Sequence, residues 1–140
     1  CLATEKAAVG MVPGTHGSTF GGNPMAVAAG NAVMDVMLAP GFFDRVNATA
    51  RLLRTKLEAL VAAYPKLFAE LRGSGLLLGI RCQQGVPAGD FVAKLRANGL
   101  LCLTAGDNVL RILPPLIVGE REIEEGVAIL DKVAREWPAS

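Results

Sequence analysis

The chain contains few of the residues that build metal sites and disulfide frameworks. Its 140 residues include a single histidine and three cysteines, Cys1, Cys82 and Cys102. No CxxC pair is present, so suitably spaced ligands for a four-ligand zinc site are missing and we expect no metal. An odd number of distant cysteines is typical of reduced thiols rather than of a disulfide framework, which favours a cytoplasmic protein.

An excess of charge of either sign is also missing. Fourteen basic residues stand against thirteen acidic ones, which gives a formal net charge of +1. Without a basic surface, binding to nucleic acid or to an anionic membrane is not expected. The longest apolar run, residues 24–38, is too short to cross a bilayer and carries Asn31 and Asp35. The start of the chain has neither a signal-peptide pattern nor a methionine, so we expect a segment that begins partway through a larger protein.

Apolar residues make up 51% of the chain, and in the first half they follow helical spacing. Asn23 and Pro24 form a strong helix start, an N-cap followed by proline, and the helix is predicted to run to Leu38. It is apolar nearly all round, which predicts burial. A second helix is predicted over residues 42–63, for which a short coiled-coil seam is the alternative interpretation. Its apolar face consists of Phe43, Val46, Ala50, Leu53, Leu57 and Leu60.

The second half of the sequence changes to strand-like patterns. Short apolar runs bounded by glycine or by turn residues are typical of strands, and an Asn-Gly pair at residues 98–99 is a typical helix end. The order of these elements indicates an α/β fold, more narrowly an α+β layer in which helices cover a small, mostly antiparallel sheet. We predict strands over residues 75–82, 100–104 and 108–112, the last two forming a hairpin, and helices over residues 87–99 and 120–137.

The loop GTHGSTFGGNP, residues 14–24, is the most unusual stretch of the sequence. Its glycines allow sharp turns and close approach to a ligand, and it leads directly into a helix N-terminus, which favours anions. Ser18 and Thr19 add hydroxyl donors, so the composition suits a phosphate site. The nucleotide-binding fingerprints are absent, and a tight loop that only permits helix packing is an equally good interpretation. A hydrolase pair of His16 and Ser18 is not favoured, because residues two apart in a loop seldom form one.

Arg111 is the other candidate site residue. It stands among apolar neighbours in NVLRILPPL, on a predicted strand that a proline pair ends. A buried arginine at this place would need a carboxylate or phosphate partner. The alternative is an arginine on an edge strand that points to water.

Residues 14–37 resemble the segment that follows the cofactor lysine in class III pyridoxal-phosphate-dependent aminotransferases. In that family the pattern His-Gly-x-Thr-[Phe/Tyr]-Gly-Gly-Asn-Pro is distinctive, and residues 16–24 match it at every fixed position. LRGSGLLLGI from Leu71 and VLRILPPL from Val109 are similar to two further family segments, in the same order. The resemblance covers nearly the whole chain. The start CLATEKAA and the form of the loop are most similar to members that use N-acetylornithine.

The resemblance implies the C-terminal part of a fold-type I pyridoxal-phosphate-dependent transferase. Residues 1–40 would end the large cofactor-binding domain, and residues 41–140 would form the small C-terminal domain. By family pattern, Thr19 binds the phosphate of pyridoxal 5'-phosphate held by the partner subunit of a homodimer. Ser18 lies beside it, near cofactor or substrate. Arg111 lies at the active site, where it pairs with a glutamate or helps to receive a substrate carboxylate.

The implied activity is transfer of an amino group from N-acetylornithine, or a similar ω-amino donor, to 2-oxoglutarate in arginine biosynthesis. The family's Schiff-base lysine is expected upstream of Cys1, so we assign no catalytic residue to this chain and expect it to be inactive alone. The small molecules involved are amino acids and 2-oxo acids. The alternative is a stand-alone α/β anion-binding or regulatory module without catalysis.

Overall fold

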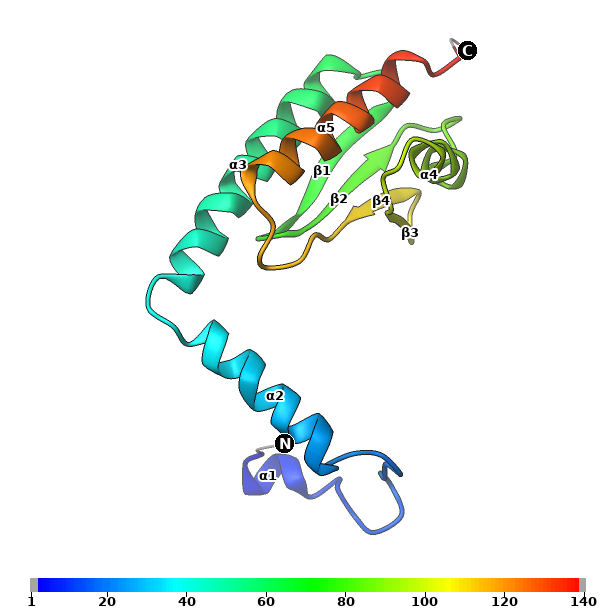
Figure 1. The fold of residues 1–140 in the computed structure, drawn as a ribbon. Coiled ribbons are helices and arrows are strands. Elements are labelled where there is room, and N and C mark those ends of the chain that lie inside the picture. Colours follow the sequence, from blue (N-terminus) through cyan, green and yellow to red (C-terminus); the bar gives the residue numbers. More distant parts are fainter. Residues whose placement is uncertain (1–2, 139–140) are drawn as a thin grey trace. The chain divides into compact units, whose positions relative to one another are not determined.

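The computed structural model describes residues 3–138, which fall into two units divided between Pro40 and Gly41. The first unit contains the short helix α1 (Glu5–Ala8), the glycine-rich loop and helix α2 (Pro24–Met37). The second contains all the strands and the remaining helices (Figure 1). No single helix among residues 3–138 is long and apolar enough to cross a membrane. Helix α2 together with α3 (Phe42–Ala63) reaches the required length and apolar composition, but the pair is interrupted by a break.

Helix α2 begins where the sequence predicts. The Asn23 side chain accepts a hydrogen bond from the Ala26 N–H at 2.9 Å, and Pro24 occupies the first turn. The expectation that α2 is buried is wrong for this structure, because no residue of α2 is buried. Within the first unit no other element packs over the helix, so its apolar side chains stay exposed.

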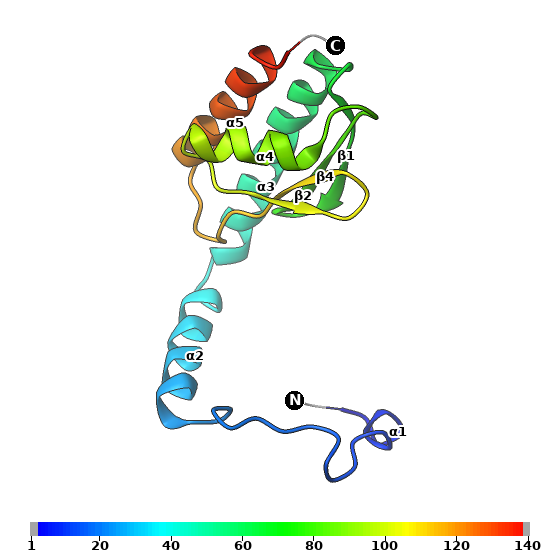
Figure 2. The same ribbon diagram turned by 90° about the vertical axis from the view of Figure 1, so that its right-hand side faces the viewer.

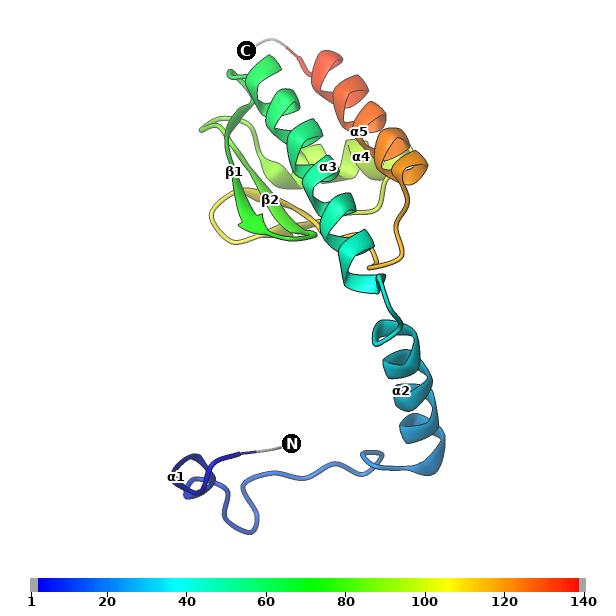
Figure 3. The same ribbon diagram turned by 90° about the vertical axis from the view of Figure 1, so that its left-hand side faces the viewer.

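The second unit is a four-stranded sheet with three helices on one face. In order along the chain it contains α3 (Phe42–Ala63), β1 (Phe68–Ser74), β2 (Leu77–Cys82), α4 (Ala88–Ala97), β3 (Leu103–Ala105), β4 (Val109–Ile112) and α5 (Glu120–Arg135). The strand order is β1-β2-β4-β3, and every pair is antiparallel. The predicted small antiparallel sheet and the hairpin of β3 and β4 are therefore confirmed. Figure 3 shows α3 and α5 lying side by side.

Strand β1 is absent from the sequence-based prediction. It pairs with β2 along its whole length, but the register shifts between Phe68 and Glu70. This bulge puts Phe68 and Leu71, three residues apart, on the core side, so the alternation expected of a strand is lost in the sequence. The predicted strand 100–104 is also shorter in the structure, where β3 begins only at Leu103.

The core lies between the sheet and the helices α3, α4 and α5 (Figure 2). Phe91 is fully buried on α4 and contacts Phe68 edge-on, with ring centroids 5.3 Å apart, and stacks on Trp137 at 4.8 Å. On α3 the apolar face begins with Phe42 and not with Phe43, which is 49% exposed. The coiled-coil alternative fails, since Leu53, Leu57 and Leu60 pack into this core.

Candidate functional site

The glycine-rich loop is held by its own polar side chains. The Ser18 hydroxyl accepts a hydrogen bond from the Gly21 N–H at 2.8 Å, and the Asn23 amide donates to the Phe20 carbonyl at 2.6 Å. A Cβ atom at position 21 would lie 2.8 Å from the Ser18 oxygen, so this tight turn requires glycine. Gly22 has a φ of +75°, which a residue with a side chain adopts only with strain.

Thr19 is an exposed residue of this loop. Among residues 3–138 no hydrogen bond is found for its hydroxyl, whereas the neighbouring Thr15 donates to the Val12 carbonyl at 2.7 Å. Ser18 uses its oxygen as an acceptor, so its hydroxyl proton is still available to an acceptor. The loop therefore presents two hydroxyl donors, of which only Ser18 also holds the turn.

The N-terminus of α2 offers fewer free donors than its sequence suggests. Pro24 has no N–H, and the Ala26 N–H is bonded to the Asn23 side chain. Of the first three helical residues, only Met25 keeps an N–H without a partner among the described residues. Binding of an anion by this loop would thus depend mainly on the hydroxyl groups and the loop backbone rather than on the helix end.

Arg111 belongs to the second unit and lies on the face of the sheet that no helix of this unit covers. It is exposed, and no ion pair or hydrogen bond of its side chain is found in the described part of the chain. Both sequence-based interpretations are partly wrong. Arg111 is neither buried nor on an edge strand, because β4 lies between β2 and β3.

An ion network lies on the same face of the sheet as Arg111. Glu70 Oε1 accepts a hydrogen bond from Arg72 Nε at 2.8 Å and lies 2.9 Å from Arg81 Nε, though without hydrogen-bond alignment. Arg72 also reaches the turn between β3 and β4, where its guanidinium lies 2.8 Å from Asp107. The hydrogen bond from Arg72 lowers the pKa of Glu70 below its ordinary value. Sequence reasoning missed this network because it missed β1, which carries two of its members.

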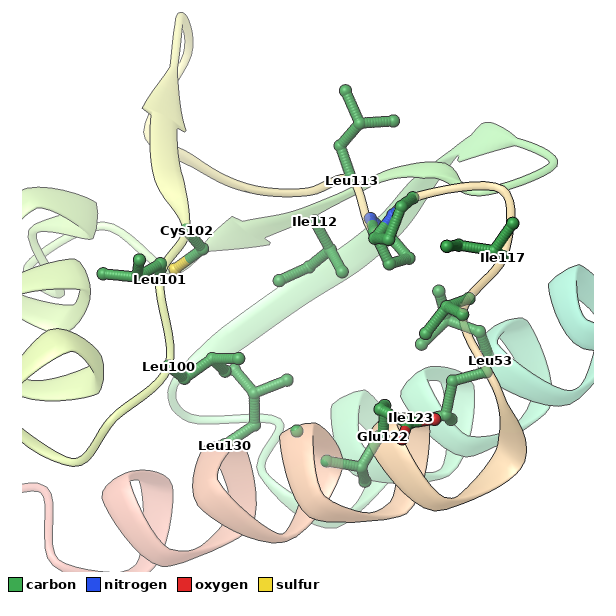
Figure 4. Close-up of a pocket in the computed structure, with 15 residues that line it drawn as sticks. Leu53, Leu100, Leu101, Cys102, Ile112, Leu113, Ile117, Glu122, Ile123 and Leu130 are labelled. Atoms are coloured by element: carbon green, nitrogen blue, oxygen red, sulfur yellow. The ribbon is translucent and has the colours of Figure 1, made fainter. Parts of the chain in front are cut away.

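A largely apolar cavity of about 560 Å³ lies beside the segment that follows β4. Figure 4 shows Ile112 at the end of β4 and Leu113 directly after it, with Leu130 of α5 among the other lining residues. Glu122 is its only charged lining residue, and its carboxylate already accepts from the Gly119 N–H at 3.1 Å and pairs with Arg121. Cys102 also lines the cavity, and burial raises the pKa of its thiol, which favours the neutral, less reactive form. The cavity therefore provides mainly apolar surface.

The comparisons with known proteins agree with each other. The model of the family described as Aminotransferase class-III matches residues 1–134. Acetylornithine aminotransferase 1 of Bradyrhizobium diazoefficiens is 56% identical over 131 residues, which are 94% of this chain and 32% of the relative. The acetylornithine aminotransferase of Agrobacterium fabrum is 49% identical over 139 residues, 99% of this chain and 34% of the relative. The chain thus spans about a third of the length of these curated relatives.

Solved structures show the same likeness. The crystal structure of acetylornithine aminotransferase from Elizabethkingia anophelis superposes with a TM-score of 0.80 at 33% identity, over 97% of this chain and 36% of that one. An ornithine aminotransferase from Plasmodium yoelii gives a TM-score of 0.80 at 27% identity, over 96% of this chain and 36% of the other. These neighbours have the fold of type I pyridoxal-phosphate-dependent transferases. By the family match and by these relatives, the chain belongs to the class III aminotransferases.

Proposed function

We propose that this chain is the C-terminal part of an aminotransferase that moves an amino group from N-acetylornithine, or a similar ω-amino donor, to 2-oxoglutarate in arginine biosynthesis. The complete family pattern over residues 16–24, inside a family match that spans residues 1–134, carries the proposal. The relatives named for acetylornithine support the choice of donor. A stand-alone anion-binding module is less favoured, since the match covers both units.

The loop fits the phosphate group of pyridoxal 5'-phosphate. A phosphate needs several donors that are not already used, and the exposed Thr19 hydroxyl and the Ser18 hydroxyl proton meet this need. When bound, pyridoxal phosphate supplies the electron sink that lets an amino group pass between an amino acid and a 2-oxo acid. In the proposal, Thr19 donates to the phosphate, Ser18 lies beside it, and the glycines let the backbone come close.

We further propose that the Schiff-base lysine is supplied from outside these residues. Three of the five lysines are engaged within the second unit. Lys56 pairs with Glu124 at 3.1 Å, Lys132 donates to Asn98 at 2.9 Å, and Lys94 lies over the Trp137 ring. Treatment of the chain with pyridoxal phosphate and borohydride should therefore label no single lysine stoichiometrically. Mass spectrometry of the digest checks this, and one fully labelled lysine would contradict it.

Arg111 is proposed as a carboxylate-binding residue of the active site. Its guanidinium is exposed on the open face of the sheet and has no acidic partner among residues 3–138. A guanidinium in this state is suited to a planar, two-point contact with a carboxylate. The glutamate or substrate that provides this carboxylate would come from outside the second unit.

The proposed partner is a second copy of the protein, with Thr19 reaching the cofactor phosphate of the neighbouring subunit of a cytoplasmic homodimer. Helix α2 supports association, because it exposes large apolar side chains such as Met25, Val33 and Val36. Contiguous exposed apolar surface usually marks an interface. Sedimentation velocity over a wide concentration range should show association of the chain, and a monomer that binds no hydrophobic dye would contradict it.

The decisive experiment is a cofactor titration of the full-length enzyme with Thr19→Val. Loss of one hydroxyl donor to a charged phosphate should weaken pyridoxal-phosphate binding by about 1.5–3 kcal/mol. The matched control is Thr15→Val in the same loop, whose hydroxyl donates to the Val12 carbonyl and is not assigned to the phosphate. Equal affinity of Thr19→Val and wild type would mean that the loop has only a structural role.

A further inference from the structure

The register of the sheet places Arg72 and Arg111 in one row on the open face. Arg72 of β1 is paired with Gly79 of β2, and Gly79 is paired with Arg111 of β4. Directly paired residues of neighbouring strands project from the same face of a sheet. The two arginines therefore flank a residue without a side chain, and no side chain of β2 separates them in this row.

The neighbouring row of paired residues on this face, two positions along each strand, carries further charges. Glu70 is paired with Arg81, and Arg81 is paired with Val109. Asp107 lies in the turn just before β4, with a φ of +64°, and Arg72 reaches it across the sheet. Val109 is only 7% exposed. A Cβ atom at Gly79 would lie 2.7 Å from a Val109 methyl carbon, so the face is tightly packed beneath the ion network.

The charges of this face do not cancel. Its two carboxylates, Glu70 and Asp107, are both engaged by Arg72, and Glu70 also lies against Arg81. Three guanidiniums thus stand against two carboxylates, and Arg111 is the one that no described carboxylate engages. If Arg72 were absent, Glu70 would keep Arg81, whereas Asp107 would lose its guanidinium partner. Arg111 would then be the uncommitted guanidinium of this face.

We propose that Arg72 is a positioning residue for Arg111: it holds Glu70 and Asp107 in the ion network, so that Arg111 remains available to a carboxylate from outside the unit. The inference deepens the role proposed above for Arg111. It concerns how charge is distributed around Arg111, and the binding of a carboxylate to Arg111 can be measured without enzyme activity. Failure of the aminotransferase proposal would therefore leave it open to an independent test.

Two substitutions at the same ion pair distinguish this role from a merely structural one. Arg72→Gln removes a positive charge and frees Asp107, while Glu70 keeps Arg81 beside it. Because Arg111 would then be the uncommitted guanidinium of this face, its affinity for an added carboxylate should fall. Asp107→Asn breaks the same Arg72–Asp107 pair but removes a negative charge, so the affinity should be kept or should rise. If the pair served only to stiffen the sheet, both variants would change the affinity in the same direction.

The experiment is a titration of the 140-residue chain, labelled with ¹⁵N-arginine, with succinate as the carboxylate probe and NMR of the arginine Nε–H groups as the readout. In wild type the Arg111 signal should respond and the Arg72 and Arg81 signals should not. In Arg72→Gln the Arg111 signal should already be displaced without succinate, and its affinity should drop about 5-fold, the upper range for an exposed ion pair. Arg72→Lys should restore wild-type behaviour.

Arg121→Gln is the matched control, because the exposed Arg121 pairs with Glu122 and Glu125 of its own helix α5, away from the open face. It should leave the Arg111 response unchanged. An unchanged Arg111 response in Arg72→Gln, or an equal loss of affinity in Arg72→Gln and Asp107→Asn, would overturn the proposal. Asp107→Asn retains the Glu70–Arg72 hydrogen bond, so it tests the sign of the effect even if Arg72→Gln does not fold.

Discussion

Asn108 offers a sharp test of how the second unit is held together. Its side-chain oxygen accepts a hydrogen bond from the Ala88 N–H at 2.8 Å, at the first residue of α4. Its side-chain NH₂ donates to the Val86 carbonyl at 2.9 Å, with longer contacts to Gln83 and Cys82. The residue has a φ of +57°, a conformation that asparagine tolerates better than most residues. One side chain thus joins the β3–β4 turn, the loop after β2 and the start of α4.

Substitution of Asn108 by alanine should destabilise the chain through two separate effects. The two short hydrogen bonds are worth about 1 kcal/mol each, and alanine in the left-handed region costs about 1 kcal/mol more. The free energy of unfolding should therefore fall by about 3 kcal/mol. Asn108→Gly removes the hydrogen bonds but tolerates the backbone conformation, so its loss should be smaller, about 2 kcal/mol.

Asn108→Asp tests the direction of the hydrogen bonds. An ionised carboxylate would place an oxygen against the Val86 carbonyl, where the amide now donates, so the folded state should raise the pKa of the introduced carboxyl above the unfolded value of about 3.9. The destabilisation should then be full at neutral pH. It should shrink as pH falls through the folded and then the unfolded pKa, because both states become protonated.

Urea unfolding followed by circular dichroism measures these differences. With a slope of about 2 kcal/mol/M, a loss of about 3 kcal/mol lowers the unfolding midpoint by about 1.5 M. The matched control is Asp107→Asn, next to Asn108 in the turn, which breaks only an exposed ion pair and should cost less than about 1 kcal/mol. Equal stability of Asn108→Ala and wild type, or no pH dependence in Asn108→Asp, would refute the reasoning.

Two further stability predictions come from the same unit. Gly73→Ala should destabilise strongly, by more than about 3 kcal/mol, because its Cβ atom would lie 2.1 Å from the Leu77 carbonyl oxygen, whereas Gly75→Ala meets open space and should cost only about 1 kcal/mol in urea unfolding. Tyr64→Phe removes the hydrogen bond from the tyrosine hydroxyl to Asp131 at 2.7 Å and should cost about 1 kcal/mol. That hydrogen bond is the main reason why the pKa of Asp131 is lowered, so the difference from wild type should be largest at neutral pH and disappear as acid protonates Asp131. A difference that grows in acid would contradict this.

The sequence predicts those elements whose signals are local. Asn23 with Pro24 marks the start of α2, and Asn98 with Gly99 marks the end of α4, because caps act through hydrogen bonds to nearby backbone. The start of α4 is different. Its N-cap residue is Pro87, which offers no side-chain cap, and the bond to Ala88 comes from Asn108, twenty residues further along the chain. No pattern within the helix itself could have indicated this partner.

The failure to predict strand β1 has a physical reason of the same kind. Its bulge breaks the period of two. Its polar residues, Glu70 and Arg72, pair with each other and also with Arg81 on β2 and Asp107 in the β3–β4 turn. Helix α2 shows the converse case. Its apolar sequence indicates burial, but no element of the first unit covers it. The composition of a helix thus predicts that its apolar face will be covered. Only the structure shows whether other elements of the same unit cover it.

Thr19 and Arg111, the two candidate ligand-binding residues, share one property that the sequence alone does not reveal. Ser18 and Asn23 bond to the loop that contains Thr19, and Arg72 and Arg81 engage the carboxylates on the face that contains Arg111. In each unit these neighbours bond to one another, whereas the Thr19 hydroxyl and the Arg111 guanidinium have no partner among residues 3–138. A family pattern can mark both donors, but their availability depends on the neighbours. Substitution of a neighbour should therefore alter binding at Thr19 or Arg111 without touching either residue.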